Sequence, residues 1–387
     1  MSLKKNIRLL TWFNFFTDFK LYAPIAIIYF SHITHSYALG ASIFAITQIS
    51  SALLDIPTGI FADRVGRKKT IVIGAASAVL YVIFYAIGMN FWFLAVGALF
   101  EGISRAFYSG NNNALLHNML SEEGLEDEYH EHLGKLSSMF QVALAVSGLL
   151  GAFIASWSFP VLMWLSVIPQ IMCLFISFQI IDSKKAIEKS DNLLSDLKEG
   201  ITDFVSNANL RLLSISSILD YGLGETSYEF QAAFYNTLLP IWAVGVAKIT
   251  SNISSGLGFH FSGKLIKKFR SIPILFFGET YNEIVSFFAL IFVTKLTPFL
   301  LSSTSFFYGT RTIIVSSLMQ KEFTDKQRAT MSSLNSFAGS LFFGVFAFMT
   351  GLFADKVGAR NAMLVIQILS LSRTYLIWRF YKLPSNS

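Results

Sequence analysis

The chain has 387 residues, of which 53% are hydrophobic and only 14% are charged, and its formal net charge at pH 7 is +6. An ordinary soluble domain carries about 25% charged residues, so this composition excludes a water-soluble fold of this length. The single cysteine, Cys173, excludes a disulfide framework and a thiolate metal site.

Long apolar segments recur along the whole chain, separated by short charged stretches. A transmembrane helix needs about 20 apolar residues, and in lipid its backbone must satisfy its own hydrogen bonds. The sequence therefore predicts an all-α membrane protein with about twelve transmembrane helices. In chain order, we expect them at residues 9–30, 37–61, 70–89, 91–117, 133–156, 160–181, 210–238, 240–262, 271–293, 296–319, 329–353 and 362–381. The seventh and eighth are separated by Pro240 alone, so that break is the ambiguous one.

Basic residues are concentrated in the loops that an even number of spans would place on one side of the membrane. The opposite loops hold only Lys295, Lys356 and Arg360. By the positive-inside rule, we expect both termini in the cytoplasm and the protein in the inner or plasma membrane. Topology and contact with anionic membrane lipid explain the net charge without a nucleic acid partner.

The longest internal polar stretch lies near the midpoint of the chain, with six predicted spans on each side. We expect two pseudo-symmetric six-helix halves, residues 1–182 and 210–387, joined by a cytoplasmic linker, residues 183–209, that contains a short amphipathic helix. The segments GIFADRVGRKK (59–69) and FHFSGKLIKKF (259–269) are weakly similar, as diverged repeats of a transporter would be.

The segment GIFADRVGRKK resembles the signature loop of the major facilitator superfamily, G-x-L-A-D-[RK]-x-G-R-[RK], and falls, as in that family, between the second and third spans. The preceding Asp55-Ile-Pro57-Thr resembles the lead-in of its drug:proton antiporter-like branch. The resemblance covers essentially the whole chain. It implies the major facilitator fold, secondary transport by alternating access, and a gating motif composed of Asp55, Gly59, Asp63, Arg64, Gly66, Arg67 and Lys68.

Each part of that motif has a physical expectation. Gly59 would let two helices approach closely, and Gly66 would allow a tight turn. Asp63 would meet the positive end of a neighbouring helix, while Arg67 and Lys68 would pair with acidic groups on adjoining helices. The resemblance implies that these contacts stabilise the outward-facing state; the alternative is a basic turn that only sets topology.

The chain departs from the antiporter-like pattern at several positions. Asparagines replace the acids that some members carry at the end of the fourth span, and Ala98 replaces an arginine usual in the family. The fifth span has Ser147-Gly148-Leu-Leu-Gly151 without the proline of the antiporter motif. We interpret its two glycines as helix packing within the bundle.

Ionisable side chains inside the predicted spans are costly in lipid and commonly mark a transport pathway. The family places its first, fourth, seventh and tenth spans around a central cavity, and most of these charges lie on those spans. The candidates for substrate or proton binding are Asp18, Tyr22, Glu101, Arg105, Asp220, Glu225, Glu229 and Arg311.

Spacing suggests how these candidates are arranged. Asn14, Asp18 and Tyr22 recur every four residues, which predicts one polar stripe. A carboxylate in a dry cavity could load and release protons; the alternative is fixed pairing of Asp18 with Lys20.

Other intramembrane residues carry further expectations. Tyr221, Glu225, Tyr228 and Glu229 are expected to share a face, with Asp220 adjacent, and Glu101 and Arg105 could simply pair with each other. Glu279 and Glu283 lie four apart on a span that the family keeps at the periphery. We expect Lys248 and Arg373 to extend toward a membrane interface.

The leading hypothesis is a proton-coupled exporter of small amphipathic or drug-like molecules. The alternative is an importer or facilitator of a polar metabolite, nutrient or siderophore in the same fold. The sequence has no phosphate-binding loop, metal motif or nucleophile with its base, so we expect no enzyme activity and no cofactor other than the coupling proton. The expected partners are the substrate and membrane lipid, and we expect a monomer because this fold encloses its own pathway.

Overall fold

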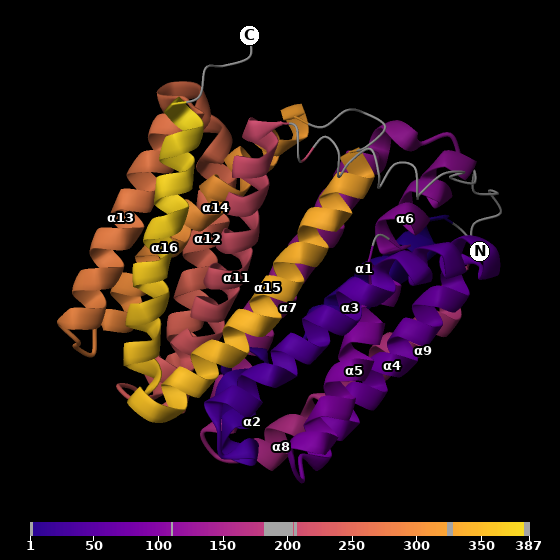
Figure 1. Ribbon diagram of the computed structural model, residues 1–387. Helices are drawn as coiled ribbons and strands as arrows, with labels where there is room; N and C mark the ends of the chain where they lie inside the picture. The colour runs from indigo at the N-terminus through magenta and orange to yellow at the C-terminus, as the bar shows by residue number, and fades with distance from the viewer. Residues whose placement is uncertain (1–2, 110, 182–203, 205–206, 323–327, 383–387) are drawn as a thin grey trace. The chain divides into compact units, whose positions relative to one another are not determined.

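The computed structural model describes residues 3–109, 111–181, 204, 207–322 and 328–382 (Figure 1). All regular secondary structure in these ranges is helical. The predicted linker helix falls on residues outside them. By their internal contacts, residues 1–189 with 240–245 form one compact unit, and residues 190–239 with 246–387 form a second.

In chain order, the described helices of the first unit, α-helical and 3-10, are α1 (Leu3–Asp18), η1 (Ala23–Ile25), α2 (Ala26–Thr34), α3 (Tyr37–Val65), α4 (Arg67–Ile87), α5 (Phe91–Tyr108), α6 (Asn111–Glu122), η2 (Glu126–Glu128) and α7 (Tyr129–Ala155), followed by α8 (Phe159–Leu165) and α9 (Val167–Gln179). The second unit contains α11 (Ala208–Asn236), α12 (Ile241–Phe269), α13 (Ser271–Ile291), α14 (Thr297–Glu322), α15 (Arg328–Val357) and α16 (Ala359–Lys382). The first residues of α12, up to Gly245, belong to the first unit.

The helices of the two units pack in the same order. In the first unit, α1 packs against α7 and α9, and α4 packs against α5 and α9. In the second unit, α11 packs against α15 and α16, and α13 packs against α14 and α16. When the helices are numbered by predicted span, the first span of each unit packs against its fifth and sixth spans, and the third packs against the fourth and sixth. Two structural repeats produce this pattern.

Within the described residues, six helices are long and apolar enough to cross a membrane by length and composition. They are Tyr37–Asp55, Arg67–Ile87, Glu131–Ala155, Phe159–Gln179, Ser271–Ile291 and Met331–Val357. The helices α1, α5, α11 and α14 fall outside this set. Each of them carries ionisable side chains, which lower the mean hydropathy of a span. The break at Pro240 is confirmed, because α11 ends at Asn236 and α12 begins at Ile241.

Three expected spans are not single helices. The prediction of one helix over 9–30 is wrong, because α1 ends at Asp18 and α2 begins at Ala26, with the 3-10 turn η1 between them. Pro24 lies in this turn; proline has no backbone N–H and disfavours helical geometry in the residue before it. The fourth span ends at Tyr108 rather than at residue 117, and the sixth is divided at Ser166.

Glycines let pairs of helices approach closely at equivalent places in the two units. A Cβ atom at Gly102 of α5 would lie 2.8 Å from the carbonyl oxygen of Thr47 on α3. A Cβ atom at Gly309 of α14 would lie 2.6 Å from the carbonyl oxygen of Ser255 on α12. These contacts leave no room for a larger residue. Gly151 of α7 packs on the carbonyl of Leu21, which lies in the turn after α1 rather than in a helix.

Candidate functional site

A charged cluster in the first unit is centred on Glu101 of α5, which is 5% exposed. One carboxylate oxygen, Oε1, accepts from Lys20 Nζ at 3.1 Å and from Arg105 Nη2 at 2.8 Å. The other, Oε2, accepts from the Tyr85 hydroxyl at 2.9 Å. The i,i+4 pair of Glu101 and Arg105 is therefore present, and Lys20 joins it from the break between α1 and α2. Two cations and one hydroxyl therefore hold this carboxylate in position.

Asp18 lies at the end of α1 and does not form the ion pair with Lys20 that was the alternative expectation. It is the last residue of α1 and only partly buried, and among the described residues it forms no ion pair. The expected pairing with Lys20 is wrong because Lys20 turns to Glu101. The partial negative charge at the C-terminal end of α1 favours the Lys20 ammonium and disfavours an ionised Asp18.

The predicted polar stripe on the first span is interrupted. Asn14 accepts a hydrogen bond from Asn112 Nδ2 at 3.1 Å, but Tyr22 lies beyond the end of α1 and does not continue the helical face. Tyr22 is 3% exposed, and its ring centroid lies 5.7 Å from that of Tyr85. The stripe prediction fails because it assumed an unbroken helix.

The signature loop forms the junction of α3 and α4. Gly66 has φ 100°, a backbone conformation that favours glycine, so the predicted tight turn is confirmed. Arg67 Nη1 donates to Asn111 Oδ1 at 3.1 Å, and Asn111 is 2% exposed. From the sequence we expected acidic partners for Arg67, and Asn111 was not among the predicted residues.

Other parts of the motif contribute less to the described structure. The close approach expected at Gly59 is wrong, because a Cβ atom there would meet no described atom within 4 Å. Arg64 is exposed, and Asp55 and Lys68 are half-buried. The side chain of Asp63 lies outside the described part of the structure.

The second unit contains a closed ring of four charged side chains, each from a different helix. Asp220 of α11 accepts from Arg311 of α14 and, at 2.7 Å, from Arg373 Nη1 of α16. Glu279 of α13 forms an ion pair with Arg311, whose Nε lies 2.9 Å from Glu279 Oε1. Glu279 Oε2 accepts a hydrogen bond from Arg373 Nε at 3.1 Å, and Arg373 Nη2 lies 2.8 Å from the same oxygen. Each acid thus bridges both arginines, and the formal charges cancel.

This charge ring is buried: Glu279 is 4%, Arg373 6% and Arg311 7% exposed. The expectation that Arg373 extends toward an interface is therefore wrong. The pairing of Glu279 with Arg311 was not predicted, because no spacing along the chain relates α13 to α14. Four inward-facing charges on four helices fix the rotation of each helix about its axis.

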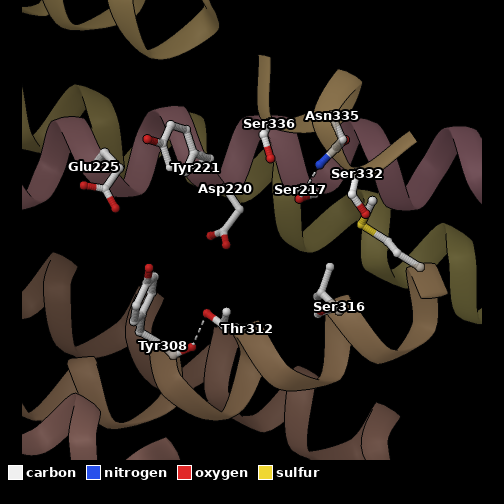
Figure 2. A pocket seen from close by; sticks show the side chains of 12 residues that line it. Ser217, Asp220, Tyr221, Glu225, Tyr308, Thr312, Ser316, Ser332, Asn335 and Ser336 are labelled. Carbon is white, nitrogen blue, oxygen red and sulfur yellow. Dashed lines mark hydrogen bonds between the residues drawn. The ribbon is translucent and has the colours of Figure 1, made fainter. Parts of the chain in front are cut away.

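A cavity of about 240 Å³ opens beside the ring, between α11, α14 and α15. Figure 2 shows Asp220, Tyr221 and Glu225 lying along α11 on one side, with Tyr308 and Thr312 of α14 opposite. The rest of its polar wall consists of Ser217, Ser316, Ser332, Asn335 and Ser336. The cavity therefore combines two carboxylates, two aromatic rings and several neutral hydrogen-bonding groups. Asp220 belongs to both the ring and the cavity.

The expected common face on α11 is divided. Tyr228 does not line the cavity; its ring lies under Lys248 of α12, with Nζ 3.0 Å from the ring centroid. Lys248 is 2% exposed and donates to the carbonyl oxygen of Tyr228 at 2.6 Å. The expectation that Lys248 extends toward an interface is therefore wrong. Glu229 is half-buried and is not among the residues that line the cavity.

Among the described side chains, no three His, Cys, Asp or Glu residues are arranged to hold a metal ion. Of the predicted candidates, Asp18, Glu101 and Arg105 lie near the break in the first span. Asp220, Glu225 and Arg311 lie at the cavity and ring of the second unit.

Comparisons with known proteins relate the whole arrangement to transporters. A family model described as Major Facilitator Superfamily matches residues 9–347. An uncharacterized transporter, BU466, from Buchnera aphidicola is 27% identical over 175 residues, covering 45% of this chain and 43% of its own. A Na⁺, Li⁺, K⁺/H⁺ antiporter from Planococcus maritimus is 23% identical over 224 residues, covering 56% of this chain and 49% of its own. The chain thus spans less than half the length of these two relatives.

A likeness to solved structures extends over nearly the full chain. The crystal structure of the nucleoside transporter NupG superposes with a TM-score of 0.81 at 12% identity, covering 99% of this chain and 100% of NupG. At this identity the likeness shows a common fold alone.

Proposed function

The chain belongs to the Major Facilitator Superfamily, and from that membership we propose that it is a proton-coupled secondary transporter that exports small cationic, amphipathic or drug-like molecules. We place it in the inner or plasma membrane as a monomer, with both termini in the cytoplasm. Its coupling ion is the proton, and it transports its substrate without changing it chemically. The substrate-binding site opens alternately to the two faces of the membrane.

The observation that carries the substrate class is the cavity of the second unit. Its wall places the carboxylates of Asp220 and Glu225 near the rings of Tyr221 and Tyr308. Carboxylates favour a cation by charge, and aromatic faces favour a cation and apolar groups together. A molecule with a positive amine and an apolar body would satisfy both kinds of group.

Proton coupling is supported by Asp18. It is partly buried, it forms no ion pair among the described residues, and it ends a helix whose partial charge opposes its own. A carboxylate in such a place gains by binding a proton. The neighbouring Glu101, by contrast, is fixed by Lys20 and Arg105.

The second candidate function is import or facilitation of a polar metabolite. The hydroxyl- and amide-rich side of the cavity, formed by Ser217, Ser332, Asn335 and Ser336, favours it. These groups would bind a substrate with several hydrogen-bonding groups better than an apolar dye. Direction of transport and proton dependence separate the two functions.

The proposed function is tested by dye efflux from energised cells that lack their own pumps. The parent is compared with Asp18→Asn and Glu225→Gln, with and without a protonophore. We expect protonophore-sensitive efflux in the parent. Each variant should reduce the rate about tenfold or more, since a charge-assisted contact is worth about 1.5–3 kcal/mol.

The matched control is Glu131→Gln, which alters an exposed carboxylate paired with Lys135 near the cytoplasmic end of α7. It should retain the parent rate. If the parent reaches the membrane but exports none of a broad panel of cationic and neutral dyes, drug export is wrong, and uptake of polar nutrients becomes the function to measure.

A further inference from the structure

Glu283 is a buried carboxylate that neither the charge ring nor the cavity uses. It lies one turn after Glu279 on α13 and is 6% exposed. Its Oε2 accepts from Gln367 Nε2 at 2.5 Å, and its Oε1 lies 2.6 Å from the Ser370 hydroxyl oxygen. Both partners are neutral side chains of α16. Among the described residues, Glu283 forms no ion pair.

The charged groups around Glu283 are already balanced without it. The ionisable side chains facing this region are Glu279 on its own helix, Arg373 of α16, Arg311 of α14 and Asp220 of α11. Two acids and two arginines cancel one another in the ring. An ionised Glu283 would therefore be an extra buried negative charge held only by neutral donors, which is an unfavourable state.

The hydrogen atoms available at Ser370 point to the same conclusion. A serine hydroxyl has one hydrogen to donate. The Ser370 oxygen lies 2.7 Å from the carbonyl oxygen of Gln367 and 2.6 Å from Glu283 Oε1. If its hydrogen goes to the carbonyl, the contact with Glu283 is a hydrogen bond only when Glu283 carries a proton and donates it to Ser370. If Glu283 is ionised, the hydroxyl must turn toward it.

We propose that Glu283 is a proton-binding site, with the Ser370 hydroxyl switching its hydrogen between Gln367 and the carboxylate as the proton leaves and returns. The proton binds Glu283 Oε1, and no other bond changes. The site lies on α13, away from the cavity wall. A change in the charge of Glu283 would act on the cavity through the charged side chains of Arg373 and Asp220. This inference rests on the proposed proton coupling and names a second group that takes part in it.

The test is infrared spectroscopy of the purified full chain in lipid nanodiscs, titrated from acid to alkaline pH in H₂O and D₂O. We expect a protonated carboxylic acid band that shifts in D₂O and disappears in Glu283→Gln. The same band should survive in Asp18→Asn. In Ser370→Ala it should move to higher frequency, because the acid loses its hydrogen-bond acceptor.

A carboxylic acid spectrum that is the same in the parent and Glu283→Gln at every pH would overturn the proposal. If Glu283→Gln does not fold, Ser370→Ala decides, and an unmoved band contradicts the site. The spectra do not depend on transport. If the band behaves as expected but the protein exports no dye, the proton site at Glu283 is supported and drug export is wrong. If the protein exports dye but shows no such band, only the proton site at Glu283 is wrong.

Discussion

At the residue scale, the charge ring accounts for most of the ionisable side chains buried in the second unit. Arg311 and Arg373 are each held by two carboxylates, and those acids come from α11 and α13. Burying an ion pair contributes little net stability, but removing one partner leaves a costly unpaired charge. The ring therefore specifies how its four helices are rotated about their axes. It also connects Asp220, which lines the cavity, to helices that do not line the cavity.

Arg373→Ala should lower the stability of the protein severely. Asp220 and Glu279 would each lose one of two cations, and breaking such a buried pair costs about 3–5 kcal/mol. The matched control is Lys135→Ala, whose partner Glu131 is 67% exposed, and which should cost less than about 1 kcal/mol. Thermal unfolding in detergent compares the two.

A double-mutant cycle sharpens this test. Arg373→Ala combined with Glu279→Ala removes a balanced pair, so the double variant should unfold at a higher temperature than the summed single effects predict. Additive effects, or a single Arg373→Ala variant as stable as the parent, would show that the ring is not an energetic unit.

Sequence spacing predicted some of these residues and not others. The pair of Glu101 and Arg105 follows from helical spacing within α5, and the turn at Gly66 follows from glycine in a known motif. Partners on separate helices, such as Glu279 with Arg373, depend on how each helix is rotated. No periodicity along one chain records that rotation, so the ring could not be predicted.

At the element scale, the first span is divided into two helices with a 3-10 turn between them. The turn places Lys20 on Glu101 and leaves Asp18 at a helix end. The sequence indicates this turn by Pro24, which follows the opposite charges of Asp18 and Lys20 inside an apolar segment. Averaging hydropathy over a whole span hides this indication. Broken helices commonly form ion and substrate sites in transporters, and the proposed coupling residue, Asp18, lies at such a break.

Close helix packing provides a second test at this scale. Gly102→Ala would place a methyl group 1.9 Å from Ser50 Oγ and 2.8 Å from the Thr47 carbonyl oxygen. Forcing α3 and α5 apart should cost about 1–3 kcal/mol. Thermal unfolding of the purified variant measures the loss.

Gly134→Ala is the control for this substitution. Gly134 lies in α7, and a Cβ atom there meets no described atom within 4 Å. Alanine should be neutral or stabilising by up to about 1 kcal/mol, because it favours helix more than glycine does. Equal stability of the two variants would contradict the close contact between α3 and α5.

At the scale of the whole molecule, each unit repeats the other in the order of its packed helices, but not in its chemistry. The first unit has an acid without an ion pair, Asp18, beside a fixed cluster. The second has a neutral ring, a polar cavity and the excess carboxylate of Glu283. Composition and the signature loop were enough to predict the fold and the transporter class. They could not predict the substrate, because the cavity wall is assembled from α11, α14 and α15.

The proposed exchange of protons for a cationic molecule can be measured in proteoliposomes. Vesicles with an acidic interior and an internal pH dye receive ethidium outside, with protein-free and Asp18→Asn vesicles as controls. We expect ethidium uptake together with alkalinisation of the interior in parent vesicles, beyond both controls. Ethidium uptake with no change in internal pH, or with acidification, would contradict proton exchange.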